Sequence, residues 1–357
     1  MKILVAAGGT GGHIYPALAL IEKFKSHDKN TKVIYVGTKN RMEKDIVPKL
    51  GIDFRSIEIY GLTKNVIKDV KNIYLIIKDI NEMKKLMKEF QPDVVLGIGG
   101  YVTYPVIKAA HELKIPIFIH EQNALPGKVN RLTEKYANLI GVSFKESMKY
   151  FKNKNVFYSG NPTGDRALTI KKVKKSDIGL DENKKLIVVV AGSLGSSTLS
   201  NKLKEYLKLV NDKDYQVLYI TGKNIYDDFI KDEYSKNVKV VPYFDNLPGI
   251  LKSADLLITR AGASTIAEII SLKIPSIFIP SPYVANNHQY YNALALKEKN
   301  CAELIEENKL DVNNLIDTID KMLNNKDVYI DNLNKMDTVD SSELIYQKIE
   351  EMLKNAK

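Results

Sequence analysis

The chain has 357 residues, of which 44% are hydrophobic and 27% charged, and its formal net charge is +10. This length and composition predict a globular protein of about two domains, each with its own core. No apolar run reaches the roughly eighteen residues of a membrane span, and the first residues do not resemble a secretion signal, so we expect a cytoplasmic protein. One cysteine and five scattered histidines suggest neither a disulfide nor a zinc site.

The positive charge is concentrated in the first half of the chain. Residues 1–160 carry 26 lysines and arginines against 15 acidic residues, a net charge of +11, whereas residues 161–357 carry 27 against 28. A field of this sign attracts nucleic acid, phosphorylated lipids and anionic membrane surfaces. The charge alone does not choose among these partners.

Short β-branched runs alternate with amphipathic stretches of helical length, a pattern typical of βαβ units and parallel sheets. In the first half we predict strands near residues 3–6, 33–36, 94–98, 117–119, 139–142 and 156–158. In the second half we predict strands near residues 186–190, 216–220, 238–241, 256–259, 276–279 and 302–304. The pattern predicts an α/β fold of two Rossmann-like, doubly wound domains that face each other across a cleft.

The join between the domains is expected where strand character stops, near residues 160–162 and the lysine-rich residues 171–176. We therefore place the first domain at residues 1–160 and the second at residues 161–357. Residues 341–354 read as a last helix that can pack back across the join.

Gly8–Gly12 follow the first predicted strand directly and precede a predicted helix. Glycine lets the backbone approach a ligand closely, and a helix start offers N–H groups and about half a positive charge to an anion. The spacing fits neither the dinucleotide fingerprint nor the P-loop. We predict a phosphate or pyrophosphate site, the alternative being a tight turn without a ligand.

Two similar turns occur in the second half, at residues 191–197 and 260–265. Both place small residues and hydroxyl groups at predicted helix starts, and Glu268 lies one turn into the second helix. Such an arrangement suits a nucleotide diphosphate, with helix dipoles for the phosphates and a carboxylate for the ribose hydroxyls. Ordinary N-caps and a first-turn charge would also explain these residues.

Six motifs occur in one order: GGTGGHIYPA at residues 8–17, GGYV at 99–102, HEQN at 120–123, GNP at 160–162, RAGASTIAE at 260–268 and NHQYYNA at 287–293. Together they resemble the MurG family, undecaprenyl-diphospho-muramoylpentapeptide N-acetylglucosaminyltransferases with the GT-B fold. The resemblance implies transfer of N-acetylglucosamine from UDP-N-acetylglucosamine to lipid I, which is undecaprenyl-pyrophosphoryl-MurNAc-pentapeptide. The product, lipid II, is a peptidoglycan precursor.

The resemblance also implies that the first domain binds lipid I and the second binds the donor. The implied donor contacts are Thr10, Gly11 and Gly12 at the phosphate or sugar, Asn123 at the sugar, Ser193 at the diphosphate, Phe244 beside the uracil, Ala263, Ser264, Thr265, Ile266, Ala267 and Glu268 along the phosphates and ribose, and Gln289 at the sugar hydroxyls. Where the family often has an arginine two residues after GNP, this chain has Gly164, and Arg166 is a candidate for that role.

The implied mechanism is a single displacement with inversion, in which the acceptor's hydroxyl attacks the anomeric carbon as UDP leaves. It needs a base at the hydroxyl and positive potential at the diphosphate. His13 is the predicted base or acceptor-phosphate contact, and Glu121 is the rival base. The alternatives are a helix-start hydrogen bond for His13 and a loop-ordering role for Glu121. No cofactor or metal ligand is predicted, and help from a divalent ion is left open.

Residues 66–90 are predicted to form an amphipathic helix. The stripe predicted to be core consists of Val66, Val70, Ile73, Ile77, Ile80 and Met87. Leu75 and Leu86 are expected on the opposite face among lysines, where they would contact an anionic membrane surface. We therefore expect a peripheral protein at the cytoplasmic face of the membrane, the alternative being a solvated helix face.

Two other functions stay open from the residues alone. Another UDP-sugar enzyme of the same fold, such as an epimerase or a glycolipid glycosyltransferase, would share the glycine-rich turns. A basic nucleic-acid-binding protein would use the charge of the first half. The chain has no tryptophan and no aromatic-basic motif, so nucleic acid is not predicted as a partner.

Overall fold

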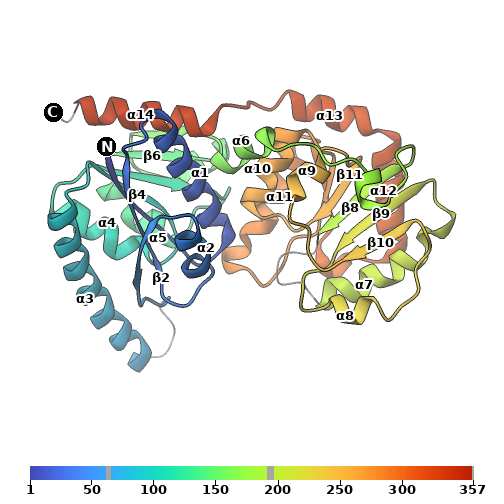
Figure 1. Cartoon of the computed structure of the whole chain (residues 1–357), viewed down its shortest axis with the longest axis horizontal. Coiled ribbons are helices and arrows are strands. Elements are labelled where there is room, and N and C mark those ends of the chain that lie inside the picture. Colours follow the sequence, from blue (N-terminus) through green and yellow to red (C-terminus); the bar gives the residue numbers. More distant parts are fainter. Residues whose placement is uncertain (62–65, 191–196, 356–357) are drawn as a thin grey trace. The chain divides into compact units, whose positions relative to one another are not determined.

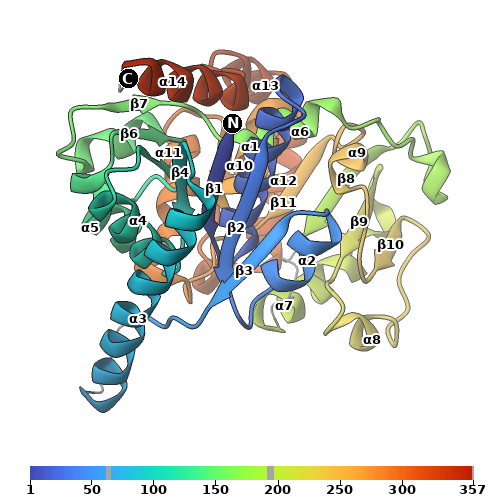
Figure 2. The ribbon, with the colours of Figure 1, turned by 60° about the vertical axis from the view of Figure 1, so that its left-hand side comes forward.

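The computed structural model describes residues 1–61, 66–190 and 197–355. The chain divides into two compact units, one made of Met1–Thr163 with Val339–Lys357 and the other of Gly164–Thr338. Each unit contains one parallel sheet flanked by helices (Figures 1 and 2). The predicted α/β fold with two Rossmann-like sheets is confirmed.

The first unit has a seven-stranded sheet in the order β3-β2-β1-β4-β5-β6-β7. Its strands are β1 (Lys2–Ala7), β2 (Lys32–Thr38), β3 (Asp53–Ile57), β4 (Val94–Gly99), β5 (Ile117–Glu121), β6 (Leu139–Val142) and β7 (Val156–Tyr158). Its helices are α1 (Gly11–His27), α2 (Glu43–Lys49), α3 (Val66–Phe90), α4 (Thr103–Glu112), α5 (Lys128–Thr133) and α14 (Ser341–Asn355), and α6 (Pro162–Thr169) crosses the boundary between the units.

The second unit has a six-stranded sheet in the order β10-β9-β8-β11-β12-β13. Its strands are β8 (Lys185–Val190), β9 (Tyr215–Ile220), β10 (Val238–Val241), β11 (Leu256–Thr259), β12 (Ser276–Phe278) and β13 (Ala302–Leu304). Its helices are α7 (Ser197–Lys208), α8 (Tyr226–Phe229), α9 (Leu247–Leu251), α10 (Ala263–Leu272), α11 (His288–Lys297), α12 (Val312–Asn324) and α13 (Lys326–Asn334).

Strand β1 shows why the central strands are continuous apolar runs. Ile3 and Val5 belong to a core cluster on one face of the sheet, with apolar residues of α1 and α14. Leu4 and Ala6 belong to a second cluster on the other face, with residues of α3 and α4. A strand covered on both faces cannot alternate apolar with polar residues, so its whole length is hydrophobic.

Strand β3 is the one strand in the described residues that the sequence analysis missed. It is an edge strand that pairs only with β2, and Asp53, Arg55 and Ser56 are exposed. An edge strand needs only a partial apolar face, so its sequence carries a weak hydrophobic signal.

The last helix, α14, packs on α1 within the first unit (Figure 1). Ile345 and Ile349 are fully buried in the core cluster that also contains Phe24. At the surface, the ring of His27 stacks on Tyr346 with centroids 3.9 Å apart. The final segment of the chain therefore completes the core of the unit that the first residues begin.

Helix α3 forms as predicted, and Ile80 and Met87 of the predicted core stripe do pack in the core, but the rest of the described stripe is wrong. Ile73 and Ile77 are exposed, whereas Met83 and Met87 are buried against the sheet. Leu86 packs against the same core, and Leu75 is partly buried, so the expected exposed leucine pair is also wrong. The buried set of Ile76, Ile80, Met83, Met87 and Phe90 has the same alternating spacing of four and three as the predicted one, so periodicity could not distinguish two faces about 60–100° apart. The side chains of Val66 and Val70 lie outside those described.

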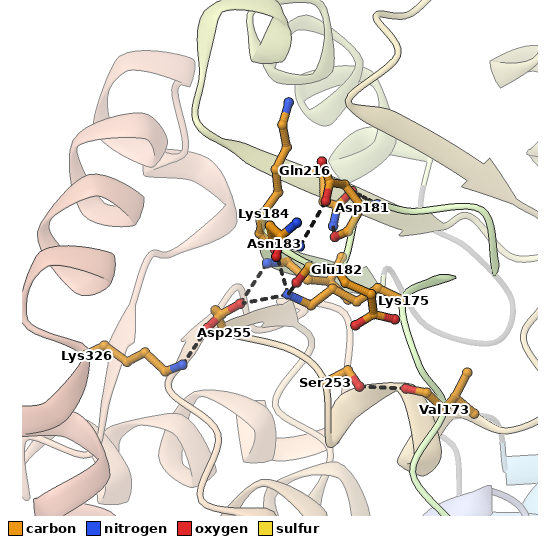
Figure 3. Close-up of polar contacts among 11 residues, drawn as sticks. Val173, Lys175, Asp181, Glu182, Asn183, Lys184, Gln216, Ser253, Asp255 and Lys326 are labelled. Atoms are coloured by element: carbon orange, nitrogen blue, oxygen red, sulfur yellow. Dashed lines mark hydrogen bonds and ion pairs between the residues drawn. The ribbon is translucent and has the colours of Figure 1, made fainter. Parts of the chain in front are cut away.

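At the amino edge of the second sheet, polar contacts tie the chain that precedes β8 to the sheet (Figure 3). Asp255 accepts hydrogen bonds from Lys326 at 2.5 Å and from the backbone N–H of Leu186 at 2.8 Å. Although burial acts to raise it, these bonds and the lysine charges hold the pKa of Asp255 below its ordinary value. Gln216 binds both backbone groups of Asp181. This edge is occupied by structural contacts, so a ligand is expected at the opposite, carboxyl edge.

Candidate functional site

The two sheets share one topological property, which locates their candidate sites. In an open parallel sheet, ligands bind beyond the carboxyl ends of the strands where the strand order reverses direction. In the first unit this point lies between β1 and β4, and in the second between β8 and β11. The loops after β1, β4 and β11 carry three of the sequence motifs, at residues 8–13, 99–102 and 260–268.

The loop after β1 leads into α1 and presents the start of that helix. Thr10 is the N-cap, and its carbonyl oxygen accepts hydrogen bonds from the backbone N–H groups of His13 at 3.0 Å and Ile14 at 3.2 Å. The side chain of Thr10 is exposed, and Gly11 and Gly12 open the helix without side chains. The first turn contains no acidic residue. This helix start can therefore accept an anion through backbone groups and its dipole.

Two glycines at the end of β4 make room for this loop. Gly99 and Gly100 have φ angles of +117° and +89°, which favour glycine. A Cβ at Gly99 would lie 2.6 Å from Nδ1 of His13, and one at Gly100 would clash with the carbonyl oxygen of Gly8. The absence of a side chain at Gly99 lets the imidazole of His13 lie against β4, and its absence at Gly100 lets the backbone of Gly8 approach.

Glu43 anchors the glycine-rich loop after β1 through a hydrogen bond to Gly9. It is fully buried, and its Oε1 accepts hydrogen bonds from the backbone N–H of Gly9 at 3.2 Å and from the N–H and Oγ1 of Thr38 at 2.9 and 2.5 Å. Its Oε2 is buried without a hydrogen-bond partner among the described residues. Glu43 thus joins the glycine-rich loop to the end of β2.

The predicted base His13 is hydrogen-bonded to Gln122 of the HEQN motif, and Gln122 is in turn hydrogen-bonded to His120. Nδ1 of His13 lies 3.0 Å from Oε1 of Gln122, and Nε2 of Gln122 lies 2.9 Å from Nδ1 of His120. His120 is fully buried, and burial lowers its pKa to about 4. His120 is therefore neutral near pH 7.

Glu121, the rival base, points into its own loop. Its Oε1 accepts hydrogen bonds from the backbone and side-chain N–H groups of Asn123 at 2.9 and 3.2 Å. Its Oε2 accepts hydrogen bonds from the backbone N–H of Gly127 at 2.9 Å and from Asn130 at 2.8 Å. Burial raises the pKa of Glu121, and these four donors act in the opposite direction. The geometry matches the loop-ordering alternative, and Asn123 is oriented by the same carboxylate.

In the second unit, the start of α10 carries the predicted diphosphate motif. Its N-cap is Gly262, so no side chain caps the first turn. The Oγ of Ser264 is buried and has no hydrogen-bond partner within the described part of the chain. The preceding loop is anchored by Asn292, whose side chain donates to the carbonyl oxygen of Ala261 at 3.2 Å. A fixed loop thus leads into a helix start with uncapped N–H groups and a buried hydroxyl, which suits an anion.

Glu268 follows in α10, after Thr265, Ile266 and Ala267. Burial raises the pKa of Glu268 to about 7, and the charge of Arg166 acts in the opposite direction. A Cβ at Gly164 would lie 3.0 Å from the carbonyl oxygen of Ala267 and would clash with Ser271, so α6 contacts α10 too closely for an arginine at position 164. Arg166, one helical turn from Pro162, is exposed and within electrostatic reach of Glu268.

The other predicted donor contacts of the second unit come from separate segments of the chain. Phe244 is partly buried in the loop between β10 and α9. Gln289 lies in the first turn of α11, and its Oε1 accepts a hydrogen bond from the backbone N–H of Ser281 at 2.9 Å. Ser193 lies outside the described residues. In the described parts of the chain, no group of three or more His, Cys, Asp or Glu residues could hold a metal ion, and we assign no metal ligand.

Sequence reasoning gave no role to Gln122, His120 or Glu43. The first two were visible as part of the HEQN motif, whose alternate residues point to the same side of a strand end. Glu43 had no such signal, because its contact with Gly9 depends on the pairing of β1 with β2.

Rossmann-like sheets with anion-accepting helix starts at their switch points are typical of enzymes that bind nucleotides. Residues 3–142 match the glycosyltransferase family 28 N-terminal domain, and residues 186–349 match the glycosyltransferase family 28 C-terminal domain. The chain is therefore a glycosyltransferase of family 28.

Curated relatives narrow this class to one family. The chain is 40% identical over 333 residues to the UDP-N-acetylglucosamine--N-acetylmuramyl-(pentapeptide) pyrophosphoryl-undecaprenol N-acetylglucosamine transferase of Bacillus pumilus, which is 92% of each chain. It is 37% identical over 363 residues to the enzyme of the same name from Bacillus subtilis, 99% of this chain and 100% of that one. The chain belongs to the MurG family.

Solved structures show the same fold. MurG from Acinetobacter baumannii superposes with a TM-score of 0.78 over 98% of this chain and 100% of that chain, at 23% identity. A UDP-GlcNAc 2-epimerase from Neisseria meningitidis, bound to UDP-GlcNAc, superposes with a TM-score of 0.68 over 98% of this chain and 100% of that chain, at 16% identity. Likenesses at these identities concern the fold alone.

Proposed function

We propose that this chain transfers N-acetylglucosamine from UDP-N-acetylglucosamine to lipid I and yields lipid II. The proposal rests chiefly on relatives of 37–41% identity that carry this activity in their names over nine tenths or more of the chain. The position of His13 at the switch point of the first sheet supports it. An epimerase is not favoured, because its likeness to the chain is limited to the fold.

In the proposed reaction, His13 removes the proton from the attacking hydroxyl of the acceptor's sugar. The oxygen's electron pair forms the bond to the anomeric carbon, and the bond from that carbon to UDP breaks with its electron pair on the diphosphate. Glu121 orders the loop that carries Asn123, through the four hydrogen bonds described above. A base of this kind contributes about 10²–10⁴ in rate.

The donor is proposed to bind at the carboxyl edge of the second sheet. The helix start at Ala263 and the Ser264 hydroxyl suit the diphosphate, and Glu268 suits the ribose hydroxyls. The roles of Phe244 beside the uracil, Gln289 at the sugar and Ser193 at the diphosphate follow from the family resemblance and stay predictions. Arg166 is proposed for the role of the family's arginine, supported by the effect of its charge on Glu268.

The test is transfer of radiolabelled N-acetylglucosamine from its UDP derivative to a short-chain lipid I analogue. Lipid-dependent transfer by the parent chain is expected, with a large loss in His13→Ala. The matched control is His111→Ala, a histidine of the same unit whose ring lies tilted against that of Tyr136 at the C-terminal end of α4. Binding of the donor without transfer to lipid I would contradict the acceptor assignment, and release of an epimerised sugar would favour the epimerase.

We also propose that the first unit docks on an anionic membrane surface through α3, peripherally and at the cytoplasmic face. Among the helices in the described ranges, none is long and apolar enough to cross a bilayer. Ile73, Tyr74 and Ile77 are 51%, 67% and 56% exposed on α3. Tyr60 is held beside them, because its backbone exchanges hydrogen bonds with the buried side chain of Asn72. Exposed lysines on this helix, Lys78, Lys85 and Lys88, would meet lipid phosphates.

Co-sedimentation with phosphatidylcholine vesicles, with and without phosphatidylglycerol, tests the docking surface. The double variant Ile73→Ser with Ile77→Ser is expected to weaken binding to the anionic vesicles about tenfold or more, because it removes two apolar side chains from the contact. Leu50→Ser is the control, an equally exposed residue that follows α2 on the other face of the sheet. An equal loss in both variants would contradict docking through α3.

A further inference from the structure

Beneath the glycine-rich loop, one hydrogen-bonded chain runs from His13 to a backbone carbonyl at residue 160. His13 Nδ1 lies 3.0 Å from Gln122 Oε1, Gln122 Nε2 lies 2.9 Å from His120 Nδ1, and His120 Nε2 lies 3.0 Å from the carbonyl oxygen of Gly160. Gln122 and His120 are 1% and 0% exposed. The inner two residues are thus sealed in the protein, and the outer one lies at the carboxyl edge.

The backbone carbonyl groups of Gly160 and Ile98 determine which atom donates in each hydrogen bond of the series from His13 to Gly160. The carbonyl oxygen of Gly160 can only accept, so Nε2 of His120 carries a proton. Burial keeps His120 neutral, with its pKa lowered to about 4, so its Nδ1 has no proton and accepts. The amide nitrogen of Gln122 donates to that Nδ1 and also to the carbonyl oxygen of Ile98 at 2.7 Å.

The orientation of the Gln122 amide also determines which atom donates in its hydrogen bond with His13. Because the amide nitrogen of Gln122 faces Ile98 and His120, its oxygen must face His13. An amide oxygen can only accept, so the proton of a neutral His13 sits on Nδ1 and the lone pair of the ring on Nε2. The ring lies close against the backbone of Gly99, where a Cβ would be 2.6 Å from Nδ1.

We infer that Gln122 and His120 are positioning residues that hold His13 in the Nδ1-protonated tautomer, with Nε2 as the nitrogen that accepts the proton of the acceptor's hydroxyl. The inference rests on the proposed transferase function. Gln122 then orients the histidine ring, as an aspartate does in the triad of a serine protease and an asparagine does in a cysteine protease. A neutral amide orients the ring without placing an anion beside it, so it does not raise the proton affinity of His13 as a carboxylate would.

The chain offers matched variants for the two positioning residues. Gln122→Met keeps the length of the side chain and removes both its donor and its acceptor. His120→Leu removes the acceptor for the Gln122 amide, whereas Oδ1 of an asparagine in His120→Asn can occupy the place of Nδ1 and restore it. Thermal unfolding of each full-length variant reports whether it is folded.

The first readout is nitrogen-15 NMR of the histidine rings in the full chain, at a pH where His13 is neutral. The parent is expected to show the Nδ1–H tautomer for His13, and Gln122→Met a shift towards the Nε2–H tautomer. His120→Leu is expected to shift less, because the amide nitrogen of Gln122 keeps the backbone carbonyl oxygens of residues 98 and 120 as acceptors. His120→Asn is expected to keep the parent tautomer. An Nε2–H tautomer in the parent, or an unchanged tautomer in folded Gln122→Met, would overturn the inference.

The second readout is steady-state transfer of N-acetylglucosamine to a short-chain lipid I analogue. We expect kcat to fall about 10²-fold in Gln122→Met and by a smaller factor in His120→Leu, with KM for both substrates within about threefold, and His120→Asn to recover most of the His120→Leu loss. A loss confined to KM would overturn the positioning role. If the parent transfers no sugar, the proposed function fails, whereas the NMR result still decides whether the tautomer is held as inferred.

Discussion

The carboxyl edges of the two sheets differ in how their polar groups are satisfied. At the first edge, Glu121 receives four hydrogen bonds, and Gln122 bonds to His13 and His120. At the second edge, within the described residues, the hydroxyl of Ser264 is buried without a partner and burial holds the pKa of Glu268 at about 7. A buried polar group without a partner is costly, and a ligand can relieve that cost. The first edge also has a buried atom without a partner in the described residues, Oε2 of Glu43, but the residues of its HEQN loop are bonded to one another. The comparison indicates that this loop is ordered before substrate binds, whereas the start of α10 is completed by its ligand.

The largest expected effect is on the first edge, where the reaction needs a base. His13→Ala is expected to lower kcat for transfer to a lipid I analogue about 10²–10⁴-fold. Binding of UDP, measured by calorimetry, is expected to stay within about threefold of the parent, because the contacts proposed for the uracil and the ribose, Phe244 and Glu268, lie in the second unit. Transfer within tenfold of the parent rate would remove His13 as the base.

The second effect tests whether the first edge is ordered without substrate. In Glu121→Gln, an NH₂ group replaces one carboxylate oxygen. This hydrogen-bond donor would face other donors, such as the N–H of Gly127 or the side-chain amide of Asn130. We expect the free energy of unfolding to fall by about 3 kcal/mol, measured with denaturant. Glu112→Gln, whose ion pairs with Lys84 and Lys108 are partly exposed, should cost about 1 kcal/mol or less. Equal costs would show that Glu121 does not order the loop.

The third effect uses the raised pKa of Glu268. Below pH 7 the unliganded carboxyl is mostly protonated and must lose its proton before it can accept two ribose hydroxyls, so UDP affinity should rise up to about tenfold per pH unit towards pH 7 and then level off. The folded pKa lies above the ordinary 4.5, so this group stabilises the fold most below pH 4.5 and progressively less as the pH rises to 7. Calorimetric titrations from pH 5.5 to 8.5 should show this dependence in the parent and a flat profile in Glu268→Gln; equal profiles would contradict the role.

The smallest effect sharpens the contrast at the second edge. Ser264→Ala removes a hydroxyl that has no partner in the described structure, so the free energy of unfolding should stay within about 0.5 kcal/mol of the parent or increase. Affinity for UDP should nevertheless fall about fivefold, because the hydroxyl is proposed to bind the diphosphate. A clear loss of stability with unchanged affinity would mean that Ser264 serves the fold alone.

The sequence predicted those parts of the fold that depend on local pattern. All twelve predicted strands form, because both faces of each sheet are covered and the central strands are continuous apolar runs. Strand β3 was missed because it is an exposed edge, and the buried face of α3 was misplaced because two stripes share the same spacing. Which stripe is buried depends on the tilt of the helix against the sheet, and no sequence window contains that information.

The candidate site was predictable to the level of motifs. The strand-loop-helix pattern placed His13, Ser264 and Glu268 at carboxyl edges, where the structure has them. The partners of these residues were not predictable, because they come from distant segments: Gln122 reaches His13 across 109 positions of the sequence. Contacts of that kind follow from strand order and register, which are properties of the folded sheet.

Helix α14 gives the chain an unusual order of assembly. Residues 164–338 are inserted between two pieces of the first unit, and Ile345 and Ile349 complete the core around α1. At the speed of protein synthesis, roughly 10–35 s separate the emergence of residue 163 from that of residue 339. During this interval the part of α1 that α14 later contacts, including Phe24, has no cover from α14. The half of the protein that is synthesised first is therefore the half that finishes folding last.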